Sequence, residues 1–238
     1  MLRGIYQNSS AMQLLESKMD NTANNIANVN TSGYRKRGVF FQQLVEAEQA
    51  VERNLIDVKL PAGKVATYID NTDGKFEQTG NPLDVAIKGD GFFTVQTSRG
   101  QGFTRAGEFK INSEGMLVTS DGDLVMGEGG PIELTGNNFQ VDQAGNIAID
   151  SVNVNKLLIQ KFDINDVKTD GNLFYPQGNI EAVSESDYKV SQGFVEHSNV
   201  DIVKEMVSMI TTQRNYGNNQ RLIRSYDESL KKVNMVGK

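Results

Sequence analysis

The sequence predicts an α+β fold, with a long helix at each end of the chain and an antiparallel β domain between them. Three observations carry this prediction. Apolar residues recur every seven positions near the N-terminus, and they do so again near the C-terminus. Between these two regions, short apolar runs alternate with turn sequences such as Gly89-Asp90-Gly91.

The composition limits the class of protein. The 238 residues suffice for one large domain or two modest ones. A net charge of −6 and a pI near 5.0 argue against a nucleic-acid partner, because phosphate binding needs a basic field. The absence of cysteine excludes disulfides, thiolate catalysis and cysteine-based zinc sites. The start, MLRGIYQNSSAMQLLESKMD, lacks the apolar core of a Sec-type signal peptide, and no run approaches the ~20 apolar residues of a membrane span.

An N-terminal helix is expected over residues 3–29, ending before Ser32-Gly33. Its apolar stripe is a heptad seam with one polar member, Thr22, and a stripe this narrow suits a helix partner better than a broad core. The asparagines between Asn21 and Asn30 lower its helix propensity, because their side chains compete for backbone hydrogen bonds. The expected seam residues are Ile5, Met12, Leu15, Met19, Ile26 and Val29.

A C-terminal helix is expected over residues 200–234. Ser198 or Asn199 can cap its start, with Asp201 in the first turn. Gly217 weakens the helix but does not end the apolar period. The expected seam residues are Ile202, Met206, Met209, Tyr216, Ile223 and Leu230.

The centre of the chain predicts short strands. Their spacing of roughly 8–12 residues is typical of an antiparallel β domain. Residues 46–75 read as a less regular connector, and the basic run Arg35-Lys36-Arg37 reads as a solvated turn. The clearest expected strands are 83–87, 92–95, 115–119 and 157–162.

Enzyme motifs are missing, so we expect no catalytic, cofactor-binding or metal-binding residues. The sequence has no GxGxxG, Walker or GxSxG motif. The single histidine, His197, is expected to be structural or exposed, because it has no evident catalytic partner. Residues 166–177 resemble a calcium-binding loop. However, Lys168 occupies the third position and Gln177 the twelfth, so the loop has too few oxygen ligands.

Three separated blocks resemble flagellar axial proteins, the rod, hook and related subunits. The first is ANNIANVNTSGYRK (23–36), which has Ser32 where the family usually has proline. The second is NPLDVAIKGDGFF (81–93) followed by GFTRAGEFKINSEGMLVTSDGDLVMG (102–127), and the third is QGFVEHSNVDIVKEMVSMITTQRNYGNNQ (192–220). The matching residues of the first block are Asn24, Asn25, Asn28, Asn30, Thr31, Gly33 and Tyr34.

The resemblance implies a structural subunit of the basal-body rod that assembles helically with itself and other rod subunits. It implies that residues 1–35 and 195–238 pair as an antiparallel coiled coil in the inner tube, that 36–75 form an extended connector, and that 76–194 form a β-rich outer domain. It also implies export by the flagellar apparatus without a cleaved signal peptide, and possible contact with the surrounding rings. The outward asparagines of the first helix would then meet neighbouring subunits.

Two alternatives remain open at this point. The sequence GEGGPI (127–132) and a short connector resemble the proximal rod subunit, whereas length and layout also fit the distal one. A cell-wall glycan-binding module or enzyme is the competing class. It would need a suitably spaced pair of carboxylates in a cleft, which a sequence does not show.

Overall fold

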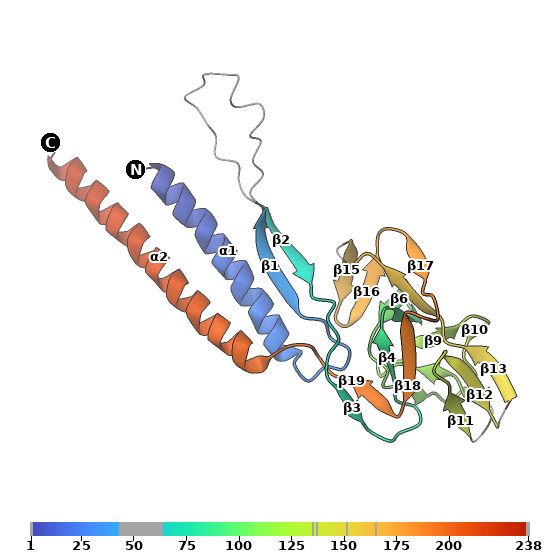
Figure 1. Cartoon of the computed structure of the whole chain (residues 1–238). Helices are drawn as coiled ribbons and strands as arrows, with labels where there is room; N and C mark the ends of the chain where they lie inside the picture. Colours follow the sequence, from blue (N-terminus) through green and yellow to red (C-terminus); the bar gives the residue numbers. More distant parts are fainter. Residues whose placement is uncertain are drawn as a thin grey trace. The chain divides into compact units, whose positions relative to one another are not determined.

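A computed structural model describes residues 2–42, 64–134, 136, 138–150, 152–164 and 166–236. The predicted α+β class is confirmed, with a helix near each end and a β-rich central part (Figure 1). The chain divides into two compact units. The helical unit comprises Met1–Ala27, Arg37–Tyr68 and Asp201–Lys238, and the β unit comprises Asn28–Lys36 and Ile69–Val200. In this division residues 28–36 and 195–200 group with the strands, and the assignment of segments to an inner tube, a connector and an outer domain stays a prediction.

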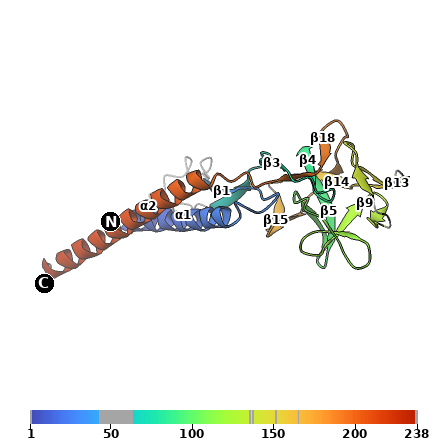
Figure 2. The ribbon, with the colours of Figure 1, turned by 90° about the horizontal axis from the view of Figure 1, so that it is seen from below.

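The helical unit contains two long helices and a two-stranded sheet within its described residues. Helices α1 and α2 contact each other along the unit, and two views at right angles show them side by side (Figures 1 and 2). Strand β1 packs against α1 and pairs with β2. Most of the expected connector between these two strands lies outside the described residues. The elements are α1 (Leu2–Ala27), β1 (Arg37–Gln42), β2 (Lys64–Ile69) and α2 (Ile202–Val236).

The helix ends differ slightly from expectation. Helix α1 stops at Ala27, so the predicted seam residue Val29 lies in the turn that follows the helix. The cap of α2 is Asp201, not Ser198 or Asn199, because Asp201 Oδ1 accepts the N–H groups of Val203 at 3.1 Å and Lys204 at 3.2 Å. The backbone hydrogen bond from Lys204 is the largest cause that lowers the pKa of Asp201 below its ordinary value.

The β unit is built from antiparallel strands, as the turn-rich sequence predicts. Its largest sheet has ten strands, with the path β15-β16-β6-β5-β9-β8-β7 and with β10, β14 and β17 attached beside it. These strands are β5 (Phe92–Thr97), β6 (Gly100–Thr104), β7 (Lys110–Ile111), β8 (Leu117–Val118), β9 (Leu124–Gly127), β10 (Gly130–Pro131), β14 (Ile159–Phe162), β15 (Val167–Asp170), β16 (Leu173–Pro176) and β17 (Ile180–Ala182).

Smaller sheets complete the unit. The order β11-β12-β13 forms a three-stranded sheet, and β18-β4 and β19-β3 form antiparallel pairs. In the last pair, Glu196 lies opposite Phe76, which brings the start of the C-terminal block beside the end of the connector. The strands are β3 (Phe76–Gln78), β4 (Val85–Gly89), β11 (Phe139–Val141), β12 (Asn146–Ile149), β13 (Val152–Lys156), β18 (Tyr188–Gln192) and β19 (Phe194–Glu196).

Two groups of buried side chains form the core of the β unit. The larger group is mostly aliphatic and includes Val85, Ile87, Phe93, Val95, Leu117, Ile132, Ile147 and Leu157. The smaller group is aromatic: the ring centroid of Phe92 lies 4.7 Å from that of Phe162 and 5.2 Å from that of Phe174. Truncating one such phenylalanine to alanine costs ~3–5 kcal/mol, so these rings are principal contributors to the stability of the unit.

Candidate functional site: a buried charge cluster

The N-terminal block enters the β unit at Gly33. Its φ of +67° lies in the left-handed region, and a Cβ at this position would overlap the backbone of Arg105 and Ala106. Its N–H donates to the carbonyl oxygen of Glu196 at 2.7 Å. Glycine therefore satisfies both the conformation and the space at this point.

Ser32, which stands where the resembling family usually has proline, has partners of its own. Its hydroxyl donates to Glu108 Oε1, and its carbonyl accepts Asn172 Nδ2 at 2.6 Å. Proline has no hydroxyl and could not make the bond to Glu108. The departure from the motif is thus matched by a local hydrogen bond.

Four charged residues form what we call the charge cluster: Arg35, Asp73, Arg105 and Glu196. The side chains of Arg35 and Arg105 are 1% exposed, that of Glu196 is 0% exposed, and that of Asp73 is 38% exposed. Arg35 Nη1 lies 2.8 Å from Glu196 Oε1, and Arg105 Nη1 lies 3.4 Å from Glu196 Oε2. Asp73 Oδ1 lies 3.3 Å from Arg35 Nη2 and 3.7 Å from Arg105 Nη1.

Backbone groups and a ring complete the surroundings of Arg105. Its Nη1 donates to the carbonyl oxygen of Ile87 at 3.1 Å, and its Nη2 donates to that of Gly89 at 2.6 Å. Its guanidinium carbon lies 5.0 Å from the centroid of the Phe92 ring, within the range of a cation–π contact. The side chain therefore joins the charge cluster to the aromatic core.

Burial shapes the electrostatics of the cluster. The pKa of Arg105 is lowered to about 10. Burial is the largest cause, and the positive charge of Arg35 acts in the same direction. Glu196, Asp73 and Asp90 oppose this shift. The carboxylates thus stabilise two like charges that would otherwise repel each other in a dry site.

The charge cluster corrects the prediction for the basic run. Arg35 is buried, not solvated, and its neighbours Lys36 and Arg37 are half-buried. Sequence reasoning missed Arg35, Arg105 and Glu196. Each is a charged residue inside one of the three blocks that carry the family resemblance, and that common feature was the available signal.

A second set of hydrogen bonds lies beside the cluster and centres on Asn199. Asn199 Oδ1 accepts the N–H of Lys36 at 2.7 Å, and its Nδ2 donates to the carbonyl oxygens of Asp70 at 3.0 Å and Thr72 at 2.9 Å. The N–H of Asp70 also donates to the carbonyl oxygen of Lys36 at 2.9 Å. The amide side chain of Asn199 therefore joins its own segment to two others, one at Lys36 and one at residues 70–72.

In the helical unit, Asn25 performs a similar role. Its Nδ2 donates to the carbonyl oxygen of Arg37 at 2.8 Å, and its Oδ1 accepts the N–H of Arg37 at 3.0 Å. The same Nδ2 lies 3.3 Å from Glu205 Oε2 of α2, and both side chains are buried. Asn25 thus points inward, whereas the more exposed Asn21 and Asn24 donate to backbone carbonyls one turn earlier in α1.

The expected seam residues have mixed exposure. Ile5 and Leu230 lie where side chains are outside the described set. On α2, Ile202 and Met206 are 38% and 48% exposed. The remaining helical members are half-buried, namely Met12, Leu15, Met19, Ile26, Met209, Tyr216 and Ile223.

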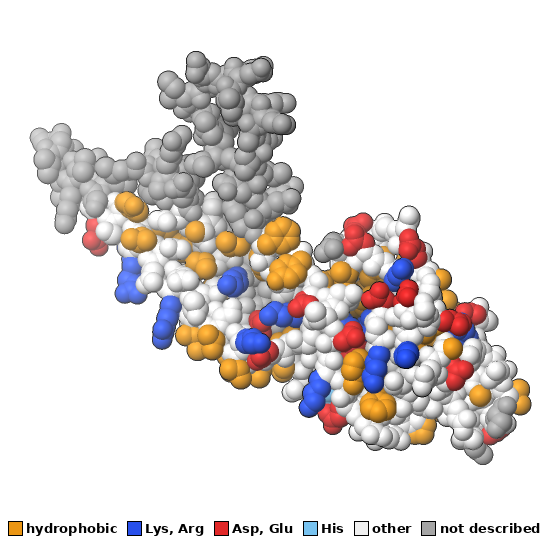
Figure 3. Space-filling view, in the orientation of Figure 1, with side chains coloured by type: hydrophobic (Ala, Val, Ile, Leu, Met, Phe, Trp, Pro, Cys, Tyr) orange, Lys and Arg blue, Asp and Glu red, His pale blue; other side chains and the backbone are white. Residues whose placement is uncertain are grey.

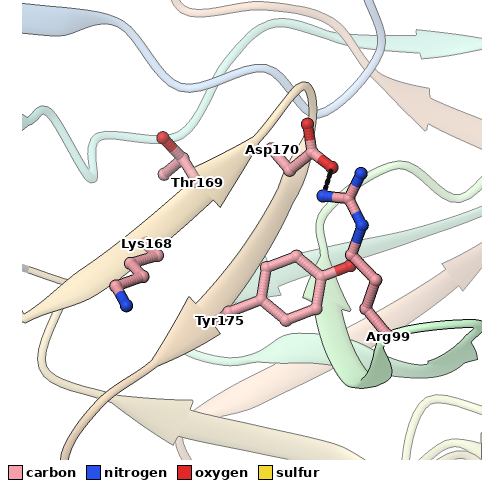
Figure 4. Close-up of a pocket in the computed structure, with 5 residues that line it drawn as sticks. All are labelled: Arg99, Lys168, Thr169, Asp170 and Tyr175. Atoms are coloured by element: carbon pink, nitrogen blue, oxygen red, sulfur yellow. Dashed lines mark hydrogen bonds and ion pairs between the residues drawn. The ribbon is translucent and has the colours of Figure 1, made fainter.

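A shallow pocket of about 350 Å³ lies in the β unit between the β5–β6 turn and the β15–β16 hairpin. Figure 4 shows the Tyr175 ring between Lys168 and the ion pair of Arg99 with Asp170. Among the five lining residues, Asp170 is the single carboxylate, and it is paired with Arg99. The lining therefore lacks the two carboxylates that glycoside hydrolysis requires.

The described residues contain no group of three or more His, Cys, Asp or Glu side chains placed to hold a metal ion. Within the same ranges, neither helix is long and apolar enough to cross a membrane. His197 is partly exposed, and its Nε2 lies 2.8 Å from Glu77 Oε2.

Three protein-family models match the chain. The model described as the flagella basal body rod protein matches residues 5–35, and the flagellar hook protein FlgE/F/G D1 domain matches residues 86–209. The flagellar basal body rod FlgEFG protein C-terminal model matches residues 191–235. Arg35 falls inside the first of these matches and Arg105 inside the second, and Glu196 lies where the second and third overlap.

Curated relatives match nearly the whole chain. The rod protein FlgF of Mesorhizobium japonicum is 35% identical over 237 residues, covering 95% of this chain and 96% of the relative. The rod protein FlgG of Bacillus subtilis is 31% identical over 260 residues, covering 98% of each chain. FlgF of Caulobacter vibrioides is 33% identical over 245 residues, covering 97% of this chain and 98% of the relative.

Proposed function

The chain belongs to the flagellar basal-body rod protein family and is a structural subunit of the rod, not an enzyme; from this premise we propose how it assembles. Helices α1 and α2 pair as an antiparallel coiled coil, and the pairs line the inner tube of the shaft. Repeated contacts whose rotation does not close then build a helical assembly with other rod subunits.

The contact between Asn25 and Glu205 supports the antiparallel arrangement. It joins the last turns of α1 to the first turns of α2, which is the contact expected of two helices that run in opposite directions from this point. The four seam residues of α1 whose side chains are described, Met12, Leu15, Met19 and Ile26, are half-buried, as expected for side chains that pack against one neighbouring helix.

Exposed apolar residues on α2 support contacts with further subunits. Val203, Val207 and Ile210 are 66%, 58% and 50% exposed, and Figure 3 shows hydrophobic side chains gathered over the first turns of this helix. A single partner helix leaves this face open. Burying it against neighbouring subunits would stabilise the assembly by ~25 cal/mol for each Å² of apolar surface removed from water.

We place the subunit in the proximal part of the rod, as a FlgF-like protein. Residues 127–132 form the tight β9–β10 turn, in which Gly130 has a φ of +109°. The alignment with FlgG of Bacillus subtilis spans 260 positions, more than the 238 residues of this chain, so that relative carries additional residues. A short connector leaves less chain for lateral contacts around the tube, which suits a short proximal segment.

The proposal also names the binding partners of the subunit and the way in which it is exported. The subunit contacts itself, other rod subunits and the rings that surround the shaft. It is exported through the flagellar export apparatus without a cleaved signal peptide, and it acts in the periplasmic part of the basal body. Residues 1–35 and 195–238 serve the inner tube, 36–75 the connector and 76–194 the outer domain.

A charge placed in the seam tests the assembly. Ile26→Asp and Met209→Asp each bury a carboxylate in the helix pair, at a cost of several kcal/mol, roughly 3 or more. We expect loss of swimming while the amides of Thr94 and Leu117 in the β unit keep their slow hydrogen exchange. Ser98→Asp, in the exposed β5–β6 turn, is the matched control and should swim normally. Normal swimming by both seam variants would contradict the proposal.

A further inference from the structure

Glu196 is bound through its side chain and its backbone to three separated segments. Its Oε1 lies 2.8 Å from Arg35 Nη1 and accepts the N–H of Gly74 at 2.9 Å. Its Oε2 lies 3.4 Å from Arg105 Nη1. Its carbonyl oxygen accepts the N–H of Gly33 at 2.7 Å.

The burial of the cluster makes these contacts mutually dependent. Glu196 is the one carboxylate of the cluster that is fully buried, whereas Asp73 is 38% exposed and interacts partly through solvent. If the carboxylate of Glu196 is removed, the guanidinium groups of Arg35 and Arg105 share one partly exposed counter-charge, that of Asp73. If Arg35 is removed, the buried carboxylate keeps the hydrogen bond from Gly74 N–H but only the longer of its two ion pairs, the one with Arg105. An unpaired buried charge is strongly unfavourable in either case.

We infer that Glu196 is a positioning residue that makes residues 32–36, 70–76 and 194–199 dock onto the rest of the β unit as one cooperative step. Each of these segments also has a hydrogen bond to another of them outside the cluster. Lys36 N–H donates to Asn199 Oδ1 at 2.7 Å, and His197 N–H donates to the carbonyl oxygen of Lys75 at 2.9 Å. The segments therefore open together or stay closed together.

The consequence concerns the chain paths that lead to the helices. The three segments border three of the four points where the chain passes from one unit to the other, at residues 36/37, 68/69 and 200/201; the fourth point is 27/28. Cooperative docking fixes three segments together: the one that precedes β1, the one that follows β2 and the one that precedes α2. This role belongs to the single subunit and does not depend on where the subunit sits in the rod.

Hydrogen exchange on the full-length subunit tests the assignment. The reporter amides are Gly33, Lys36, Gly74 and His197, and the reference amides are Thr94 and Leu117, which bond to Leu158 and Ile132 inside the β unit. We expect Glu196→Gln to accelerate all four reporters by ~100-fold or more, with a much smaller change at the references.

Two further variants separate positioning from general stability. Glu196→Gln combined with Arg35→Met removes both charges of the closest pair, so it should be no worse than Glu196→Gln alone, as expected of coupled residues. Glu77→Gln removes the negative charge of the neighbouring exposed pair with His197 and should leave the reporters unchanged. If Glu196→Gln does not fold, Glu196→Asp takes its place and should give a smaller acceleration of the same four amides.

Two results would overturn the inference. One is acceleration confined to Gly74, whose amide binds the replaced side chain directly. The other is equal acceleration of the reporters and the references, which would make Glu196 an ordinary contributor to global stability. Neither result bears on membership of the rod, which the seam-charge experiment tests independently.

Discussion

Arg35 Nη1 lies 2.8 Å from Glu196 Oε1, and both side chains are withdrawn from solvent. The first residue lies near the end of the N-terminal block of the family resemblance, and the second lies near the start of the C-terminal block. Because Arg105 of the central block binds the other oxygen of the same carboxylate, the three blocks meet at one group of atoms. The blocks are far apart in sequence, and the fold gives them a common physical role.

The crowding at Gly33 predicts a large cost for a single methyl group. Gly33→Ala adds a left-handed strain of about 1–2 kcal/mol and an overlap with the backbone of Arg105 and Ala106 worth about 1–3 kcal/mol more. Gly122→Ala is the matched control, because Gly122 also has a positive φ, +90°, but faces open space. Chemical denaturation of both variants measures the difference. Equal losses would show that the close approach does not matter.

Substitutions of Asn24 and Asn25, neighbours in α1, are expected to lower the stability by different amounts. Asn25→Ala removes the two side-chain hydrogen bonds to the part-buried backbone of Arg37, at a cost of about 0.5–1.5 kcal/mol for each bond lost. Asn24→Ala removes an exposed bond to Asp20 and should change stability by less than about 0.5 kcal/mol. The exchange rate of the Arg37 amide reports on this site. Comparable rates in the two variants would count against the inward role of Asn25.

The sequence predicted the helices well and the charge cluster not at all. Helices expected over 3–29 and 200–234 are found over 2–27 and 202–236, because a heptad period is a local signal, although the cap of α2 is Asp201 and not the expected Ser198 or Asn199. Arg35 could not be predicted as buried, because three consecutive basic residues are ordinarily solvated. Its burial depends on Glu196 and Asp73, which only the tertiary fold brings near.

The turn at Asp142 predicts a loss of stability in acid. Burial alone would raise the pKa of Asp142, but hydrogen bonds from Asn146, Ala144 and Gly145 outweigh it and hold the pKa below its ordinary value of 3.8. A depressed folded pKa contributes stability that is present above pH 3.8 and is lost as the pH falls through the folded value. Asp142→Asn should therefore be less stable than the natural chain at pH 6, and the difference should shrink below about pH 3.

Asp123 provides the control of opposite sign. Burial raises the pKa of Asp123, and the charge of Asp121 adds to the effect. Its carboxylate therefore opposes folding once the pH has risen through the folded pKa, and Asp123→Asn should be slightly more stable than the natural chain at pH 6. Urea midpoints measured from pH 6 to pH 2.5 test both variants. A fall in stability at pH 6 for Asp123→Asn would contradict the electrostatic account.

The most direct test of the central claim is the position of this chain in a density map of purified basal bodies. A proximal rod subunit predicts its density at the membrane-side end of the shaft, with α1 and α2 lining the inner tube as an antiparallel pair. Density repeated along most of the shaft would assign the chain to the distal rod instead. Absence of the chain from the shaft would contradict the account as a whole.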